Sequence, residues 1–331
     1  MLSLNIKTTH INEVKRYYSK ERNSCMKKYY PEGFLFMTEE NKEALKNIQT
    51  LENAMQEQKI LEARALMCDS EHNLVVDLNG IKGIIPRTEG AIGISGGTVR
   101  DIAIISKVGK PVCFVITKIE KDEHGENVCI LSRAQAQEKA KLEFLQNRRC
   151  GDVVDTVVTH LEPFGAFCDI ACGIPALLPI DSISVSRISH PKDRFSTGDK
   201  IKAVIKTIEN NRFTLSQREL LGSWQENASL FRQGETVSGI VRSVEDYGVF
   251  VELMPNLAGL AEPKEGVYPS QNASVYIKSI IPEKMKIKLI IIDSFDSQIK
   301  RKKEKYFYTG EHMDSWFYSP ESSKKEIKSI F

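Results

Sequence analysis

The sequence lacks the features of several common classes of protein. No apolar run approaches the roughly 20 residues that a membrane helix requires. Residues 1–4 begin a short apolar segment, but Asn5, Lys7 and His10 interrupt it, so the chain start does not resemble a signal peptide. The formal net charge of +2 is small and excludes no class of partner. We therefore expect a cytoplasmic protein that does not cross a membrane.

The cysteines also lack the spacing of a metal site. There are seven, an odd number, and none belongs to a Cys-x-x-Cys pair. Cys168 and Cys172 flank the end of an expected strand, without a second pair to complete a zinc site. We predict reduced, buried thiols, no metal and no cofactor.

One short segment matches a catalytic motif but lacks the structural context that the motif requires. Gly93, Ser95 and Gly97 match the Gly-x-Ser-x-Gly pattern of hydrolases, but that motif needs a buried strand before it and a helix after it. Here we expect a glycine-rich loop between barrel strands. No lysine follows the glycines, so the loop is not a phosphate-binding P-loop either.

What the sequence does contain is a repeated stretch, residues 163–170. Phe164 and Phe167 stand three apart around Gly165, and apolar alternation continues to Asp169. On a strand with a bulge at Gly165, both rings can reach one solvent-facing surface. Exposed aromatic pairs commonly stack on unpaired bases. This stretch alone leaves open the alternative that both rings lie in the core.

The stretch recurs 83 residues later, with Tyr247, Gly248, Phe250 and Glu252 at the corresponding positions. The flanking turns repeat at the same offset. A weaker copy lies earlier, where residues 75–78 match 167–170 at an offset of 92. Repeated period-two patterns of this kind predict tandem all-β modules in a chain whose length allows two or three domains.

The order of the pieces in the middle copy resembles the S1-type RNA-binding domain. These pieces are the Gly151-Asp152 opening, Phe-Gly-Ala-Phe, the Gly198-Asp199 return and the closing strand 212–216. The resemblance implies a five-stranded barrel of the oligonucleotide-binding (OB) fold. The predicted fold class is mainly β, with tandem S1-type barrels joined by short helices and preceded by an N-terminal helix.

The repeats also set the expected domain boundaries. In order along the chain we expect a basic leader and helix (1–58), a degenerate barrel (59–133), a helical connector (134–150), the best S1 barrel (151–218), a second helical connector (219–233), a third barrel (234–293) and a basic, aromatic tail (294–331).

The resemblance implies six RNA-binding residues. Those of the middle barrel are Phe164, Phe167 and Arg212, and those of the third barrel are Tyr247, Phe250 and Lys286. In the family a histidine often lies just after the Gly-Leu step on the third strand. Pro179 and Glu262 occupy that place here, and Glu262 would repel phosphate. His160 and His190 are interpreted as ordinary surface residues.

The first copy departs further, because His72 and Val75 replace the two rings. A barrel without these two rings is more typical of a protein-docking or packing unit than of an RNA-binding one, and the resemblance implies attachment to the ribosome. In the connectors, Phe144 and Trp224 are expected to pack against a neighbouring barrel. A stripe of Leu45, Ile48 and Leu51 predicts a helix from Thr38 to about Gln58 that docks on the first barrel.

Both ends of the chain leave alternatives open. Residues 1–38 carry seven Lys or Arg, three Glu and interleaved tyrosines, which suits either a solvated leader or RNA contact. The tail combines residues 300–303, all basic, with the rings of 306–308 and 316–318. It suits RNA, a ribosomal groove, or a short hairpin that packs on the third barrel.

The predicted function is binding of single-stranded messenger RNA, without enzymatic activity, near the small ribosomal subunit. No segment is left to supply the separate catalytic domain that S1-containing ribonucleases carry. The alternatives are a protein-interaction adaptor of the ribosome or of the RNA-decay machinery, and a regulatory subunit of an RNA-processing enzyme. No small-molecule substrate is expected.

Overall fold

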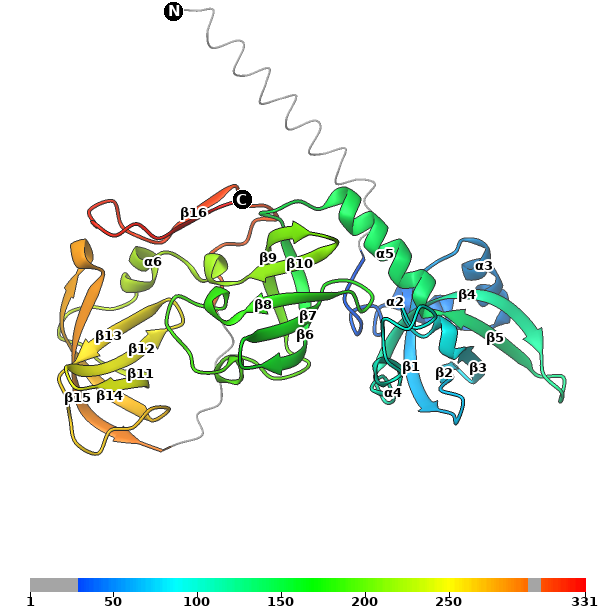
Figure 1. Cartoon of the computed structure of the whole chain (residues 1–331), viewed down its shortest axis with the longest axis horizontal. Helices are drawn as coiled ribbons and strands as arrows, with labels where there is room; N and C mark the ends of the chain where they lie inside the picture. Colours follow the sequence, from blue (N-terminus) through cyan, green and yellow to red (C-terminus); the bar gives the residue numbers. More distant parts are fainter. Residues whose placement is uncertain (1–28, 297–304) are drawn as a thin grey trace, which may run out of the picture.

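Three closed barrels lie in a row along the length of the molecule (Figure 1). The computed structural model describes residues 29–296 and 305–331. The predicted contacts of residues 1–28, and those of the basic run 300–303, therefore lie outside the described residues. Each barrel has five strands and its own buried core, as tandem OB folds require.

Barrel 1 closes in the strand order β1-β2-β3-β5-β4. Its strands are β1 (Leu61–Cys68), β2 (Leu74–Leu78), β3 (Ile81–Ile85), β4 (Pro111–Lys121) and β5 (Asn127–Ser132), with the short helices η1 (Arg87–Glu89) and α4 (Ile102–Ile105) between β3 and β4. Alternate residues point inward, and the interior is mainly aliphatic, with the buried ring of Phe114 and the thiol of Cys129. Residues 93–97 form a loop between barrel strands, as the sequence predicts.

Two helices, not one, precede barrel 1. The expected helix from Thr38 to Gln58 is wrong in this respect: α2 (Glu39–Ala44) ends at Leu45, and α3 (Ile48–Gln56) begins anew. The break occurs because the Asn47 side chain accepts from the backbone N–H of Thr50 and starts its own capping box. Leu51 and Ala54 are buried against barrel 1, so the expected docking is confirmed.

Helix α5 (Arg133–Asn147) joins barrels 1 and 2. Ser132 caps it, and Ala136, Ala140 and Phe144 are buried at four-residue intervals along one face. The Phe144 ring meets Phe213 of barrel 2 edge to face, with 5.3 Å between centroids. The predicted packing of Phe144 on a neighbouring barrel is confirmed.

Barrel 2 closes in the order β10-β8-β7-β6-β9. Its strands are β6 (Val153–Glu162), β7 (Gly165–Asp169), β8 (Pro175–Pro179), β9 (Lys200–Glu209) and β10 (Arg212–Ser216), with η2 (Ile180–Ser182) and η3 (Pro191–Asp193) between β8 and β9. The chain then continues through η4 (Arg218–Leu221) and α6 (Trp224–Ala228).

The second connector is less helical than the sequence suggests. Gly222, at a φ of 83°, separates η4 from α6 and leaves only a five-residue α-helix within the expected 219–233. A side chain there would collide with the ring of Phe307. Trp224 is nonetheless buried with the core of barrel 3, as predicted.

Barrel 3 closes in the order β11-β12-β13-β15-β14. Its strands are β11 (Thr236–Glu245), β12 (Gly248–Met254), β13 (Leu257–Ala261), β14 (Asn272–Ile281) and β15 (Lys286–Phe295), with η5 (Pro282–Lys284) before the last. Strand β15 runs four residues beyond the closing strand expected over 286–291, because β14 pairs with it along its full length.

Residues 305–331, which we call the C-terminal strap, run along barrels 2 and 3 (Figure 1). They include a hairpin of β16 (Ser315–Phe317) and β17 (Lys328–Ile330). The strap joins barrel 2 through His312 and Asp152, whose side chains lie 2.6 Å apart. It joins barrel 3 through the Tyr318 hydroxyl, which donates to the carbonyl of Asn256. Of the alternatives for the tail, the strap adopts the packed hairpin.

Candidate nucleic-acid interface

The two rings of barrel 2 form an exposed aromatic platform. Phe164 lies in the turn before β7 and is 56% exposed, whereas Phe167 on β7 is half-buried. Their centroids are 6.1 Å apart and the rings are perpendicular, an arrangement that aromatic pairs favour. The core contains neither ring, so the alternative of two buried rings is wrong.

Gly165 sets the close approach of strands beneath this platform. It pairs with Pro179 of β8, and a Cβ at this position would lie 2.6 Å from the carbonyl oxygen of Leu178. Only glycine permits that approach. The bulge, however, is not at Gly165 as expected: the irregularity lies on β6, between Val158 and His160.

Strand register extends the platform into a row of outward side chains across four strands. The row consists of Thr214 on β10, Leu177 on β8, Phe167 on β7 and His160 on β6. All four are at least partly exposed. The platform is therefore flanked by an aliphatic side chain on one side and an imidazole on the other.

His160, interpreted from the sequence as an ordinary surface residue, lies next to the platform. It pairs with Phe167, and its Nε2 lies 2.7 Å from a carboxylate oxygen of Glu162. Period-two alternation could not predict this neighbour, because the bulge on β6 shifts which residue faces Phe167.

Arg212 begins β10, two residues before Thr214, and so points outward on the same face. Its side chain is exposed to solvent. It is thus free to meet a phosphate, although it is one step along the strand from the row that contains Phe167.

Barrel 3 repeats this arrangement. Tyr247 is 67% exposed in the turn before β12, Phe250 is half-buried, and the perpendicular rings are 6.1 Å apart. Gly248 replaces Gly165, and a Cβ there would lie 2.6 Å from the carbonyl oxygen of Ala261. The equivalent platform thus rests on the same glycine contact.

The row of barrel 3 ends in a lysine. It runs through Ser243, Phe250, Leu260 and Lys288 on β11, β12, β13 and β15. Lys286, the residue chosen from the sequence, lies one step before Lys288 on the same outward side. Lys288 was not among the residues chosen from the sequence. Its position between the apolar Ile287 and Leu289 indicates an outward side chain, but only the strand register shows that it shares a row with Phe250.

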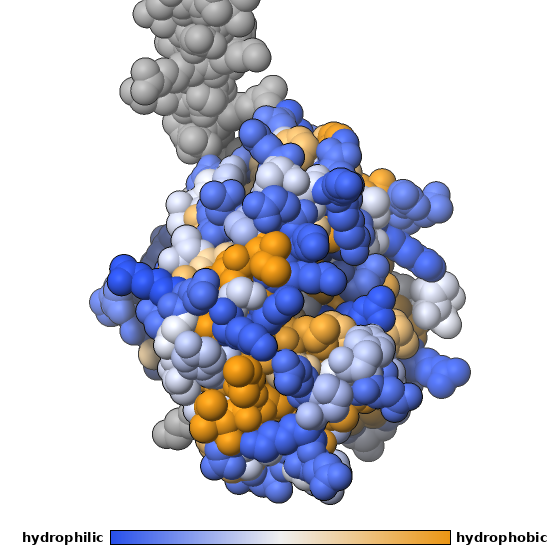
Figure 2. All heavy atoms as spheres, turned by 90° about the vertical axis from the view of Figure 1, so that its left-hand side faces the viewer, coloured by the Kyte–Doolittle hydropathy of each residue, from blue (hydrophilic) through white to orange (hydrophobic). Residues whose placement is uncertain are grey.

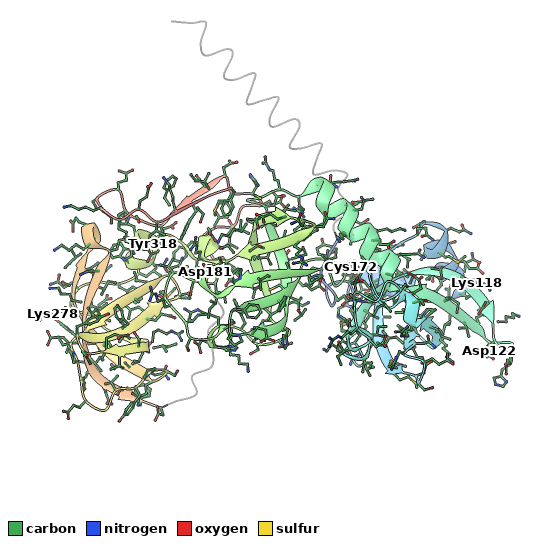
Figure 3. The ribbon with its side chains drawn as sticks, viewed as in Figure 1. Lys118, Asp122, Cys172, Asp181, Lys278 and Tyr318 are labelled. Atoms are coloured by element: carbon green, nitrogen blue, oxygen red, sulfur yellow. The ribbon has the colours of Figure 1, made fainter. Side chains whose placement is uncertain are left out.

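Glu262 directly follows β13, whose last residue, Ala261, pairs with Val249 of β12. Its side chain is exposed and lies 3.6 Å from the ammonium of Lys278 on β14. Figure 3 shows Lys278 at the far end of barrel 3. An exposed pair of this kind partly offsets the repulsion that Glu262 would exert on a phosphate.

Barrel 1 has an aliphatic row in the same place. It runs through Met67, Val75, Ile84 and Ile130, and Lys118 of β4 follows. His72 lies in the preceding turn at a φ of 65°. No aromatic side chain of the described residues takes part in this row, so barrel 1 has no stacking platform of the kind seen in barrels 2 and 3.

A buried carboxylate lies two residues beyond the half-buried ring of barrel 2. Asp169 accepts the backbone N–H groups of Glu32 and Gly173. Burial, and then the nearby charge of Glu32, raises the pKa of Asp169 to about 7. Glu32 is ionised, because Arg133 and Lys107 outweigh the effect of its own burial and lower its pKa to about 2.

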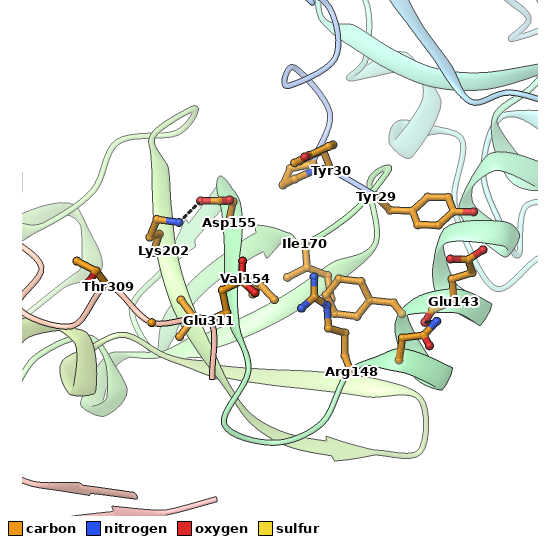
Figure 4. A pocket seen from close by; sticks show the side chains of 15 residues that line it. Tyr29, Tyr30, Glu143, Arg148, Val154, Asp155, Ile170, Lys202, Thr309 and Glu311 are labelled. Carbon is orange, nitrogen blue, oxygen red and sulfur yellow. Dashed lines mark hydrogen bonds and ion pairs between the residues drawn. The ribbon is translucent and has the colours of Figure 1, made fainter. Parts of the chain in front are cut away.

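A hollow of about 270 Å³ lies where residues 29–31, α5, barrel 2 and the strap meet (Figure 4). Tyr30 and Arg148 lie on its walls, and a 2.9 Å ion pair between Lys202 and Asp155 lies on one side. Neither platform contributes to it.

The described residues contain no cluster of three or more His, Cys, Asp or Glu able to hold a metal ion, and no helix long and apolar enough to cross a membrane.

All three barrels have five strands, and two of them carry an aromatic platform. Residues 149–217 match the family model of the S1 RNA binding domain. Barrel 2 is therefore an S1 domain, which confirms the prediction made from residues 151–218 and, with the three barrels, the predicted fold class.

Among known proteins, the chain resembles the small ribosomal subunit protein bS1. It is 30% identical to that of Rhizobium meliloti over 65% of this chain and 39% of the relative. Identity to the Staphylococcus aureus protein is 28%, over 78% of this chain and 68% of the relative. The chain thus spans well under half of the Rhizobium protein. A solved multidomain protein with nucleic acid binding domains from Streptococcus pneumoniae is 12% identical, covers 73% of this chain and 75% of its own length, and has a TM-score of 0.24.

Proposed function

We propose that this chain binds unpaired RNA through the aromatic platforms of barrels 2 and 3 and acts in translation, in the cytoplasm and at the small ribosomal subunit. The observation that carries the proposal is the repetition of one geometry: two perpendicular rings 6.1 Å apart, one exposed and one half-buried, over a glycine contact. The similarity to the small ribosomal subunit protein bS1 supports a role in translation, and we propose messenger RNA as the ligand.

The platforms bind by stacking more than by charge. Residues 151–219 contain eight Lys or Arg and nine Asp or Glu, so barrel 2 has no net attraction for phosphate. Base stacking on an aromatic side chain contributes about 1–3 kcal/mol per base and tolerates every base. We therefore propose weak sequence preference and a modest dependence of affinity on salt.

Fluorescence anisotropy with labelled poly-U RNA tests the proposal. Replacing Phe164 and Phe167 together by Ala should weaken binding by roughly 10-fold or more, since about 1–3 kcal/mol is lost at each ring that stacks. Phe317→Ala is the matched control, because Phe317 is an equally exposed ring on the strap. Equal affinities of the wild type, the double variant and the control would refute RNA binding by the platform.

The proposal includes the absence of catalysis. Incubation of the labelled RNA with the protein and Mg²⁺ should leave the RNA intact over hours. Cleavage that persists in the purified Phe164→Ala/Phe167→Ala variant would assign an enzymatic function instead.

A second candidate, a protein-interaction adaptor, has its own observation. Barrel 1 exposes the aliphatic row defined above, and Ile290 and Ile292 are exposed on β15 of barrel 3. Figure 2 shows apolar patches between polar side chains at that end of the molecule. Binding to small ribosomal subunits that is lost in Met67→Lys, but retained in the Phe164→Ala/Phe167→Ala variant, would favour the adaptor.

A further inference from the structure

The joint between barrels 2 and 3 contains a buried carboxylate, that of Glu252. This residue lies on β12 two positions beyond Phe250, so the two side chains leave the strand on the same side, about 7 Å apart. Phe250 is half-buried as part of the platform, whereas the Glu252 side chain is only 4% exposed. The platform and the joint are thus neighbours on one strand.

Two guanidinium groups from different barrels bind this carboxylate. Arg194, which follows η3 in barrel 2, donates from both Nη atoms at 2.6 Å. Arg242, on β11 of barrel 3, donates from Nε at 2.8 Å and from Nη2 at 3.2 Å. We call these three residues the Glu252 cluster. Bidentate pairs of planar groups fix orientation as well as distance.

The surrounding contacts make the joint rigid. Arg194 also donates to the hydroxyl of Ser184, and the backbone N–H groups of Val185 and Ser186 donate to Asn256 and to the carbonyl of Pro255 in barrel 3. This loop of barrel 2 directly follows β8 and η2, and β8 carries Leu177 beside Phe167. The platform of barrel 2 is therefore linked to the cluster through β8 and the loop after it, and the platform of barrel 3 through β12.

The residue equivalent to Glu252 contacts a neighbouring segment in barrel 2 but not, within the described residues, in barrel 1. Asp169, two residues beyond Phe167, is buried and accepts the N–H of Glu32 from the segment before barrel 1. In barrel 1 the equivalent Asp77 is exposed and accepts only from Gly80 of its own turn, within the described parts of the chain. Barrel 1 also has no platform, so the anchored carboxylate accompanies the platforms.

We propose that the Glu252 cluster is a positioning device that makes barrels 2 and 3 one binding unit, in which a single unpaired strand contacts both platforms at once. The inference rests on the proposed function and adds which barrels share a strand and which residues enforce it. Arg194, Arg242 and Glu252 act through the platforms and need not touch RNA. Fixed spacing raises the effective concentration of the second platform once the first is occupied.

The test compares oligouridines of two lengths, about 6 and about 24 nucleotides, chosen to occupy one barrel or to extend beyond one. The wild type should bind the long strand about 100-fold more tightly than the short one. Arg194→Ala should reduce this ratio by about tenfold by weakening only the long strand, and Arg194→Lys should fall between, since an ammonium lacks the planar fork. The matched control is Arg187→Ala, an exposed arginine of the same loop.

A second measurement separates positioning from loss of fold. In calorimetry, barrels 2 and 3 of the wild type should unfold in one transition, which divides into two in Arg194→Ala while the affinity for the short strand is unchanged. Equal effects on both lengths, or a length ratio in Arg194→Ala equal to that of the wild type, would overturn the inference but leave RNA binding intact. If neither strand binds the wild type, the proposed function fails as well.

Discussion

At the scale of single residues, the interface is decided by which side chains share an outward row. The rings at 164, 167, 247 and 250 were visible in the sequence because their spacing repeats. Their neighbours were not. A bulge on β6 brings His160 beside Phe167, and strand register places Lys288 in the row of Phe250, with Leu260 between them. A bulge changes which residue faces outward, and period-two reading cannot detect it.

Lys288 leads to a prediction about salt. If it meets a phosphate, Lys288→Ala should weaken RNA binding at low salt and reduce the slope of log affinity against log salt by about 0.7, the value for one phosphate of a single strand. Titrations of poly-U between about 50 and 200 mM salt measure this slope. Lys325→Ala, on the strap, is the control; an unchanged slope in Lys288→Ala would place Lys288 outside the contact.

A second residue-scale prediction concerns pH. The pKa of Asp169 is about 7 in the folded protein, above its value of 3.8 in an unfolded chain. The folded state therefore binds more protons between these values, and the free energy of unfolding decreases as pH rises from about 4 through 7. Glu32 acts in the opposite sense, but only as pH falls below about 4.5 towards 2.

Urea unfolding at pH 5 and pH 8 measures this effect. The midpoint should be lower at pH 8, and Asp169→Asn should reduce the difference, because the amide does not titrate. Asp181→Asn, at an exposed carboxylate, should leave the difference unchanged. A midpoint in the wild type that is higher at pH 8 than at pH 5 would contradict the raised pKa of Asp169.

At the scale of elements, each platform depends on two strands that approach over a glycine. Gly165→Ala places a methyl group against the backbone of β8, which cannot rotate away as a side chain could. We expect a loss of about 1–3 kcal/mol in the free energy of unfolding. Because the turn that carries Phe164 shifts with β7, RNA affinity should fall as well.

Chemical denaturation and poly-U binding of one Gly165→Ala preparation test both effects. Gly96→Ala is the control, since a Cβ there meets only one atom, at 4.0 Å. Wild-type stability in Gly165→Ala would mean that β7 and β8 have room to separate.

Elements also show where local signals fail. The apolar stripe over 45–51 predicted one helix, but Asn47 and Thr50 form a capping box that begins a second. The second connector was expected to be helical, yet Gly222 lies against Phe307 from a distant part of the chain. The break between the two helices depends on residues three positions apart, which a sequence can show. The short second connector depends on a tertiary contact, which it cannot.

At the scale of the whole molecule, the barrels are joined rather than strung on flexible links. The α5 helix inserts Phe144 into barrel 2, the Glu252 cluster joins barrels 2 and 3, and the strap contacts both of these barrels. The rings of Trp316 and Tyr318 are buried in the strap, so they support barrel 3 and are not available for stacking. Figure 3 places Cys172 near the junction of barrels 1 and 2, where its N–H donates to Tyr30.

The sequence by itself determined that β modules recur, that two of them carry paired rings, and that the middle one is an S1 domain. These properties are local: alternation, glycine positions and turns are set by residues close together in the chain. Only the tertiary structure decided which residues flank the rings, where carboxylates are buried and how the barrels are joined. Those properties depend on register and on contacts between distant segments, such as Glu32 with Arg133 and Arg194 with Glu252, for which one sequence carries no local signal.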